Sequence, residues 1–185
     1  IKKKDYETKI KLLKKLPEAI RNTLNSESEM EEISNIFAEA KGSMFLGRGY
    51  SYPIAMEGAL KLKELCYVHA EGYPAGEMKH GPLALIESGM PVVILAPRDK
   101  YYEKTLSNMQ EAISRGAKVL FISNKNKDEI SSDNIWKKIE VEKTSDELLP
   151  FLLTIPLQLL AFYAAKNKGY DIDKPRNLAK SVTVE

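Results

Sequence analysis

The stretch Lys41–Ala70, KGSMFLGRGYSYPIAMEGALKLKELCYVHA, carries the pattern that decides the fold. The apolar run Met44–Leu46 is closed by the glycine turn Gly47-Arg48-Gly49, and apolar residues then recur at helical spacing as far as Cys66. A second apolar run, Tyr67–Ala70, follows directly. A strand, a helix and another strand in succession are typical of a parallel sheet covered by helices.

The same alternation continues through the rest of the chain. Apolar runs without alternation predict buried strands at Pro91–Ala96 and Lys118–Ser123, and a more alternating run predicts an edge strand at Ile135–Val141. Helices are expected from about Tyr101 to Arg115 and from Leu148 to Lys168. With right-handed crossovers, the predicted fold is α/β, a three-layer helix–sheet–helix sandwich with a five-stranded parallel sheet of the flavodoxin-like type.

Helices are also expected before the sheet. An apolar stripe that begins at Ile10 predicts the first helix, ended by Pro17, and the second is expected to start at the N-cap Ser28 and to stop at Gly42. Three parts are therefore predicted: an N-terminal helical segment (1–27), the domain (28–169) and a C-terminal tail (170–185).

Composition excludes several classes of function. The 28 basic and 26 acidic residues nearly balance, which gives no electrostatic case for nucleic acid. One cysteine, Cys66, excludes an internal disulfide and fits a reducing, cytoplasmic location. The longest apolar segment, Leu148–Ala165, is interrupted by prolines and is interpreted as a buried helix rather than a membrane span. Neither His69 nor His80 has a partner at metal-ligand spacing, so no metal and no cofactor is expected.

The turn from Gly47 to Ser51 is the first candidate site. It joins a strand to a helix N-terminus, where backbone N–H groups can hold an anion. It lacks the third glycine of a dinucleotide fingerprint and the lysine of a Walker loop. The alternative is a tight turn in which Ser51 serves as an ordinary helix cap.

The second candidate is a charged stripe on the following helix. Glu57, Lys61 and Glu64 fall at i, i+4 and i+7, nearly opposite the apolar face. Spacing alone favours a solvated row of salt bridges. The functional alternative is a general base, Glu64, whose charge Lys61 stabilises beside a ligand crevice at the carboxyl ends of the strands.

The glycine- and proline-rich segment Glu71–Pro82 predicts a shaped loop that carries His80 near its tip. A histidine titrates near neutrality and therefore suits proton transfer to or from a substrate. The other histidine, His69, lies in a strand-like run and is expected to be packed.

The polar tail contains Leu178, Val182 and Val184 among its charges, a pattern that favours docking over disorder. Lys180 could then reach a crevice as an amine nucleophile or a charge clamp.

Several of these segments, taken together, resemble the glucosamine-6-phosphate synthase family (glutamine:fructose-6-phosphate aminotransferase, isomerising). The match is to its second sugar-isomerase (SIS) repeat and C-terminal tail and covers about residues 28 to 185. The segments that carry it are Gly47-Arg48-Gly49, Glu57–Glu64, His69-Ala70-Glu71, Gly76–Ala84, Pro156–Ala161 and Pro175–Glu185.

The resemblance implies an SIS-type sheet and a set of catalytic residues. Glu64 resembles the base that moves a proton between carbons 1 and 2 of the open-chain sugar, with Lys61 and Glu57 as its charged neighbours. His80 resembles the ring-opening histidine, which this family contributes across a homodimer.

For the tail, the resemblance implies that Lys180 forms a Schiff base with the ketose and that Ala179 lines the sugar site. The implied substrate and product are fructose-6-phosphate and glucosamine-6-phosphate.

The resemblance also implies two partners outside this sequence. These are a glutaminase domain that supplies ammonia and a first SIS repeat whose serine- and threonine-rich loop holds the sugar phosphate. Arg48, Tyr50 and Tyr52 stand where that loop has small hydroxyl residues, so we expect this chain alone to have little turnover. Two alternatives remain open: a non-catalytic sugar-phosphate sensor, and a related isomerase or deglycase without a glutaminase partner.

Overall fold

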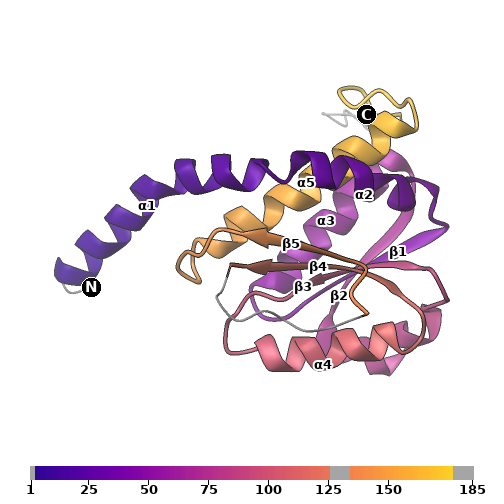
Figure 1. Ribbon diagram of the computed structural model, residues 1–185, viewed down its shortest axis with the longest axis horizontal. Helices are drawn as coiled ribbons and strands as arrows, with labels where there is room; N and C mark the ends of the chain where they lie inside the picture. Colours follow the sequence, from indigo (N-terminus) through magenta and orange to yellow (C-terminus); the bar gives the residue numbers. More distant parts are fainter. Residues whose placement is uncertain (1–2, 126–133, 177–185) are drawn as a thin grey trace, which may run out of the picture.

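The computed structural model describes residues 3–125 and 134–176 and places a parallel five-stranded sheet at the centre of the chain (Figure 1). The strands stand in the order β2-β1-β3-β4-β5. They are β1 (Gly42–Gly47), β2 (His69–Pro74), β3 (Pro91–Leu95), β4 (Lys118–Asn124) and β5 (Lys137–Val141). The helices are α1 (Lys3–Leu24), α2 (Glu27–Glu39), α3 (Ser51–Cys66), α4 (Tyr102–Ile113) and α5 (Leu149–Asn167), with 3-10 turns η1 (Ala75–His80) and η2 (Pro82–Leu85).

The chain reverses its direction of travel across the sheet between β1 and β3. From β1 it crosses through α3 to β2 at one edge, and it then returns to pair β3 with the other side of β1. This order confirms the flavodoxin-like prediction, and the edge position of β5 confirms the interpretation of its alternating pattern. In sheets of this kind, a crevice forms at the carboxyl ends of the two strands where the order reverses.

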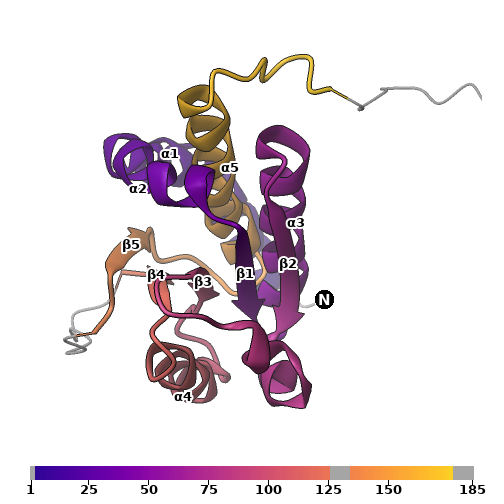
Figure 2. The ribbon, with the colours of Figure 1, turned by 90° about the vertical axis from the view of Figure 1, so that its right-hand side faces the viewer.

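Helices cover both faces of the sheet. Figures 1 and 2 show α1, α2, α3 and α5 on one face and α4 with the 3-10 turns on the other. The central strands β1, β3 and β4 are buried on both faces, so their side chains divide between two apolar cores. Phe45 belongs to the core under α3 and α5, whereas Phe121 belongs to the core under α4.

α5 is the central helix of the larger core. Among the described residues it is the one helix long and apolar enough to cross a membrane by length and composition, yet more than half of that window, 56%, is buried within the domain. It packs against α2 and α3, and Leu152, Leu157 and Leu160 are buried. The interpretation of this segment as a buried helix is therefore confirmed.

The prediction that Pro17 ends the first helix is wrong, because α1 continues through it to Leu24. Proline leaves the carbonyl four residues earlier without its helical partner. That residue, Leu13, is 47% exposed, so water can satisfy the freed carbonyl. Leu16 and Ile20 pack against the core on either side of the proline and hold the helix together. Figure 1 shows the N-terminal part of α1 extending away from the sheet.

Two predicted ends of the second helix are also wrong. α2 begins at Glu27, so Ser28 lies inside the helix, and the preceding Ser26 donates its hydroxyl to Thr23 O (2.8 Å) instead of capping. The helix ends at Glu39, and Gly42 is the first residue of β1 rather than a helix stop.

The segment Glu71–Pro82 is more regular than the predicted loop. β2 extends to Pro74, and η1 then runs from Ala75 to His80. Gly72 makes this possible, because a Cβ there would lie 2.6 Å from Met56 Cα on α3. The strand and helix therefore pack with their backbones in close contact.

Candidate functional site

The helix α3 separates an apolar face from a charged one, as its sequence pattern predicts. Ala55, Ala59, Leu62 and Cys66 are buried against the sheet and α5. Gly58 lies where α3 crosses the core, and a Cβ there would stand 2.7 Å from Leu157 Cδ1. This close packing fixes the rotation of α3 and therefore the direction of its charged side chains.

Glu57, Lys61 and Glu64 form a connected charged row on that other face. Lys61 Nζ lies 2.6 Å from Glu64 Oε2 and 3.7 Å from Glu57 Oε1. The hydrogen bond to Glu64 raises the pKa of Lys61, and it outweighs the opposing effect of partial burial. Lys61 therefore stays protonated at neutral pH and can pair with a carboxylate at either neighbouring glutamate.

The row is only partly open to solvent. The side chains of Lys61 and Glu64 are 30% and 25% exposed. Lys61 lines a hollow of about 290 Å³ whose other walls are mostly apolar. The lining residues are Leu24, Lys61, Leu65, Ile155, Gln158, Leu159 and Phe162. A row of salt bridges that serves only as a solvated surface is expected to face open solvent. A partly buried row beside an apolar hollow instead favours a binding surface.

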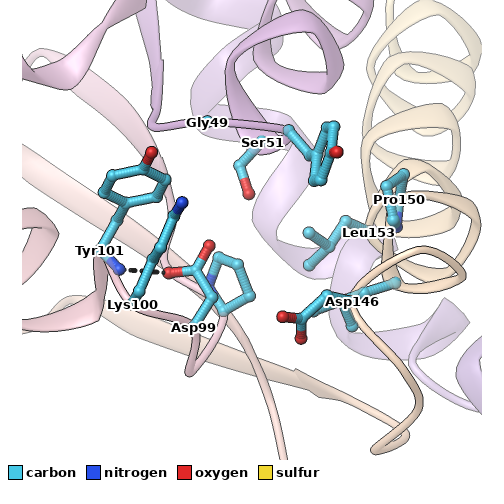
Figure 3. A pocket seen from close by; sticks show the side chains of 11 residues that line it. Gly49, Ser51, Asp99, Lys100, Tyr101, Asp146, Pro150 and Leu153 are labelled. Carbon is cyan, nitrogen blue, oxygen red and sulfur yellow. Dashed lines mark hydrogen bonds between the residues drawn. The ribbon is translucent and has the colours of Figure 1, made fainter.

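The expectation that this row borders the crevice at the carboxyl ends of the strands is wrong. α3 starts at that edge with Ser51 but runs back along the sheet, so Lys61 and Glu64 lie toward its far end. A different hollow, of about 510 Å³, occupies the crevice. Figure 3 shows Ser51, Asp99, Lys100 and Asp146 around it, with the Tyr101 N–H donating to Asp99 Oδ1 at 2.8 Å.

The turn before α3 accepts hydrogen bonds from the first two amides of that helix. The N–H of Ser51 donates to Arg48 O (3.0 Å) and that of Tyr52 to Gly49 O (3.2 Å). Arg48 donates to Asn108 Oδ1 (2.8 Å) from its side chain. These contacts favour the structural alternative of a tight turn, although Ser51 forms no side-chain cap and is itself the first helical residue.

His80 and Glu64 lie on opposite faces of the sheet. His80 is the last residue of η1, which packs with α4 on one face, whereas Glu64 belongs to α3 on the other face (Figure 2). The His80 side chain is 76% exposed, with Glu77 Oε2 at 3.9 Å from its Nε2. One chain therefore does not bring His80 and Glu64 together.

The short helix η1 holds His80 firmly despite that exposure. Ala75 and Met78 are fully buried under α4, and Lys79 pairs with Glu111 on α4 at 2.8 Å. The histidine thus projects outward from a fixed support, which is the arrangement expected of a residue that contacts another molecule.

His69 contradicts the expectation of a packed histidine. It is the first residue of β2, its side chain is 73% exposed, and its Nε2 lies 3.6 Å from Glu71 Oε1. Among the residues that the structure describes, no group of three or more histidine, cysteine or acidic side chains could hold a metal ion.

Lys180 and Ala179 lie outside the described residues, but the start of the tail is described. The backbone N–H of Arg176 donates to Tyr67 Oη (2.7 Å), and the Arg176 guanidinium lies over the Tyr67 ring at 4.0 Å. Tyr67 follows α3 directly, three residues after Glu64. The tail therefore leaves the described domain at the end of α3 that carries Lys61 and Glu64.

Sequence reasoning missed Tyr67 as part of this site because it assigned the residue to a strand. Glycine commonly follows the last residue of a helix, and here a tyrosine takes that place. This was the signal in the sequence that could have drawn attention to Tyr67.

Cys66 is predicted to be unreactive in the folded chain. Its thiol is buried and donates to Ala161 O (3.2 Å), and burial raises its pKa to about 12. At pH 8 only a fraction on the order of 10⁻⁴ is thiolate. A disulfide reagent should label the native chain slowly and the urea-unfolded chain completely. Rapid stoichiometric labelling of the native chain would contradict this placement.

Comparison with known sequences gives a consistent set of relatives. The model of the SIS domain matches residues 36–168. The glutamine–fructose-6-phosphate aminotransferase [isomerizing] of Aquifex aeolicus is 49% identical over 181 residues, which cover 98% of this chain and 30% of the relative. The enzyme of the same name from Pseudomonas putida is 49% identical over 94% of this chain and 28% of its own length. The chain thus spans less than a third of the length of these curated relatives.

Solved structures agree in fold. The C-terminal domain of glucosamine-fructose-6-phosphate aminotransferase from Francisella tularensis superposes with a TM-score of 0.89 at 42% identity, covering 95% of this chain and 49% of that one. The glucosamine-6-phosphate deaminase of Thermotoga maritima superposes with a TM-score of 0.60 at 28% identity, over 87% of this chain and 48% of that one.

Proposed function

Because this chain belongs to the SIS domain family, we propose that it is the isomerase half of a glucosamine-6-phosphate synthase. The whole protein would convert fructose-6-phosphate and glutamine-derived ammonia to glucosamine-6-phosphate in the cytoplasm. The observation that carries this proposal is the Lys61–Glu64 pair, partly buried at the point where the tail leaves the domain. The names of the relatives, at 49% identity, agree with it.

The proposed reaction begins with the tail lysine. The Lys180 amine attacks the carbon 2 ketone and releases water, which gives an imine that ammonia converts to the substrate's own imine while freeing the lysine. Glu64 then removes a proton from carbon 1 and returns it to carbon 2. The products are glucosamine-6-phosphate and one water, so the atoms balance. Lys61 and Glu57 would position the base and the sugar.

The remaining groups are proposed to come from a second subunit, from the tail of this chain and from other domains of the whole protein. His80 is exposed and lies on the other face of the sheet from Glu64, which supports a role in the site of a second subunit of a homodimer. Ala179 would line the sugar site beside Lys180. The phosphate grip would belong to a first SIS repeat and the ammonia to a glutaminase domain, since the relatives are more than three times as long as this chain.

A division into three parts accompanies this assignment. We infer that residues 1–27 connect to the preceding repeat, that 28–169 form the second SIS domain and that 170–185 complete the sugar site. Support comes from α1, whose N-terminal part extends away from the sheet (Figure 1), and from the family match, which starts after α1.

The complete polypeptide and the 185-residue chain should differ sharply in activity. With glutamine and fructose-6-phosphate, the complete polypeptide is expected to form glucosamine-6-phosphate, whereas the chain alone with ammonium should form none above background. The reason is that the chain's own turn, Gly47–Ser51, carries Arg48 and Tyr50 where a phosphate-binding loop of this kind has small hydroxyl residues, and the Arg48 side chain is held by Asn108. Product is measured by mass spectrometry. Failure of the complete polypeptide would refute the function, and turnover by the chain alone would refute the half-site assignment.

A further inference from the structure

Tyr67 has a backbone conformation that suits glycine better than tyrosine. It caps the C-terminus of α3 with φ 57° and ψ 26°, and its N–H donates to Lys63 O (3.1 Å). Within residues 3–125 and 134–176, every other residue with positive φ is a glycine. A side chain in the left-handed region carries a steric cost that glycine avoids. We therefore expect contacts of the tyrosine side chain to offset this steric cost.

The Tyr67 side chain is the centre of an aromatic and cationic cluster. Its hydroxyl accepts the backbone N–H of Arg176 at 2.7 Å, and its ring lies 4.0 Å below the Arg176 guanidinium carbon. Tyr170 packs beside it with ring centroids 5.0 Å apart, and the same guanidinium lies 6.0 Å from the Tyr170 ring. Arg176 is thus held through both its backbone and its side chain.

The segment between α5 and Arg176 is shaped to meet this cluster. Gly169 ends α5 with φ +68°, and Tyr170 and Ile172 pack against the larger core. Asp171 Oδ1 accepts the N–H groups of Asp173 and Lys174, both at 3.0 Å, and so closes a tight turn. Figure 2 shows this segment crossing from the end of α5 toward the end of α3.

We propose that Tyr67 is a positioning residue. Together with Tyr170 it forms a clamp that holds Arg176, so that the C-terminal residues that follow Arg176 begin close to Lys61 and Glu64. This inference rests on the proposed function, in which Lys180 reacts with the sugar. Lys180 follows Arg176 by four residues, and four residues of chain reach at most about 14 Å. Tyr67 lies three residues after Glu64. The clamp therefore keeps the lysine within reach of the base, and without it the amine spends less time at the sugar.

Three variants of the complete polypeptide separate this role from simple helix capping. Tyr67→Phe keeps the ring under the guanidinium and removes the hydroxyl acceptor. Tyr67→Gly removes the whole clamp and relieves the backbone. Tyr67→Asn tolerates the left-handed conformation and also lacks the ring. A role confined to the end of the helix predicts that glycine works as well as tyrosine, whereas a clamp predicts that both glycine and asparagine fail.

The readouts are borohydride trapping of the sugar on Lys180, steady-state kinetics and amide hydrogen exchange at Arg176. We expect Tyr67→Gly and Tyr67→Asn to lower the trapping rate and kcat/KM roughly tenfold, and Tyr67→Phe roughly threefold, with glutamine hydrolysis unchanged. The Arg176 amide should exchange faster in all three variants, while the thermal midpoint of Tyr67→Gly stays level or rises.

The outcomes distinguish the clamp from the function on which it rests. Trapping and Arg176 exchange at the wild-type rate in Tyr67→Gly would overturn the positioning role. A fall in trapping that accompanies a lower thermal midpoint in every variant would also overturn it in favour of a structural role. If the wild-type enzyme gives no Lys180 adduct, the proposed function fails and the catalytic purpose of the clamp fails with it, and the exchange data then report on the contact alone.

Discussion

Replacing Lys180 by alanine in the complete polypeptide is expected to abolish glucosamine-6-phosphate formation while glutamine hydrolysis continues. The physical reason is that the amine forms the imine that activates carbon 2, and alanine has no nucleophile to replace it. Borohydride reduction with labelled fructose-6-phosphate should attach the sugar to wild-type Lys180 and to no residue of the variant. Product formation and glutamate release are measured in the same reaction, so that loss of one and retention of the other is visible.

A matched control is available within the same tail. Lys174 is exposed and six residues earlier, so Lys174→Ala removes the same side chain from the described part of the segment. Its backbone N–H, which donates to Asp171 Oδ1, is unaffected by the substitution. Lys174→Ala should retain both activities. Normal product formation by Lys180→Ala would refute the imine mechanism, and equal losses in both variants would indicate a general effect of charge in the tail.

The central strands of the sheet were predictable because they are buried on both faces. Strands such as β3 and β4 consist of continuous apolar residues, and such runs bounded by turn signals leave few alternatives. Element ends were less predictable because they depend on tertiary contacts. Pro17 fails to end α1 since its neighbours pack on the core, and Ser28 lies inside α2 since Ser26 bonds back to α1.

The candidate site was predictable in composition but less so in place. Helical spacing put Glu57, Lys61 and Glu64 on one face, and the structure joins them through Lys61. Spacing could not show that this face lies at the far end of α3 from the crevice, because that depends on how the helix runs along the sheet. The contact of Tyr67 with Arg176 joins positions 109 residues apart, and no local pattern encodes such a pairing.

The second large effect is expected from Glu64→Gln in the complete polypeptide. Glutamine keeps the size of the side chain and can still contact Lys61, but it cannot accept a proton from carbon 1. We expect product formation to fall by about 10²–10⁴-fold, the usual contribution of a positioned general base. Sugar binding and trapping on Lys180 should persist, because the imine forms without this carboxylate. Exchange of the carbon 1 proton with deuterated water, followed by NMR, measures the lost step directly.

Two controls test whether the loss of activity in Glu64→Gln comes from a loss of stability rather than from the loss of the base. Glu64 and Lys61 are partly exposed, so breaking their ion pair should lower stability by no more than about 1 kcal/mol and leave the urea midpoint nearly unchanged. Glu103→Gln, the same change at an exposed position on α4, should retain full activity. The base acts after imine formation, so the two steps should respond differently in Glu64→Gln. Trapping of the sugar on Lys180 should be preserved, and exchange of the carbon 1 proton should be lost. Carbon 1 exchange at the wild-type rate would show that another group is the base, and Glu64 would then remain only a partner of Lys61.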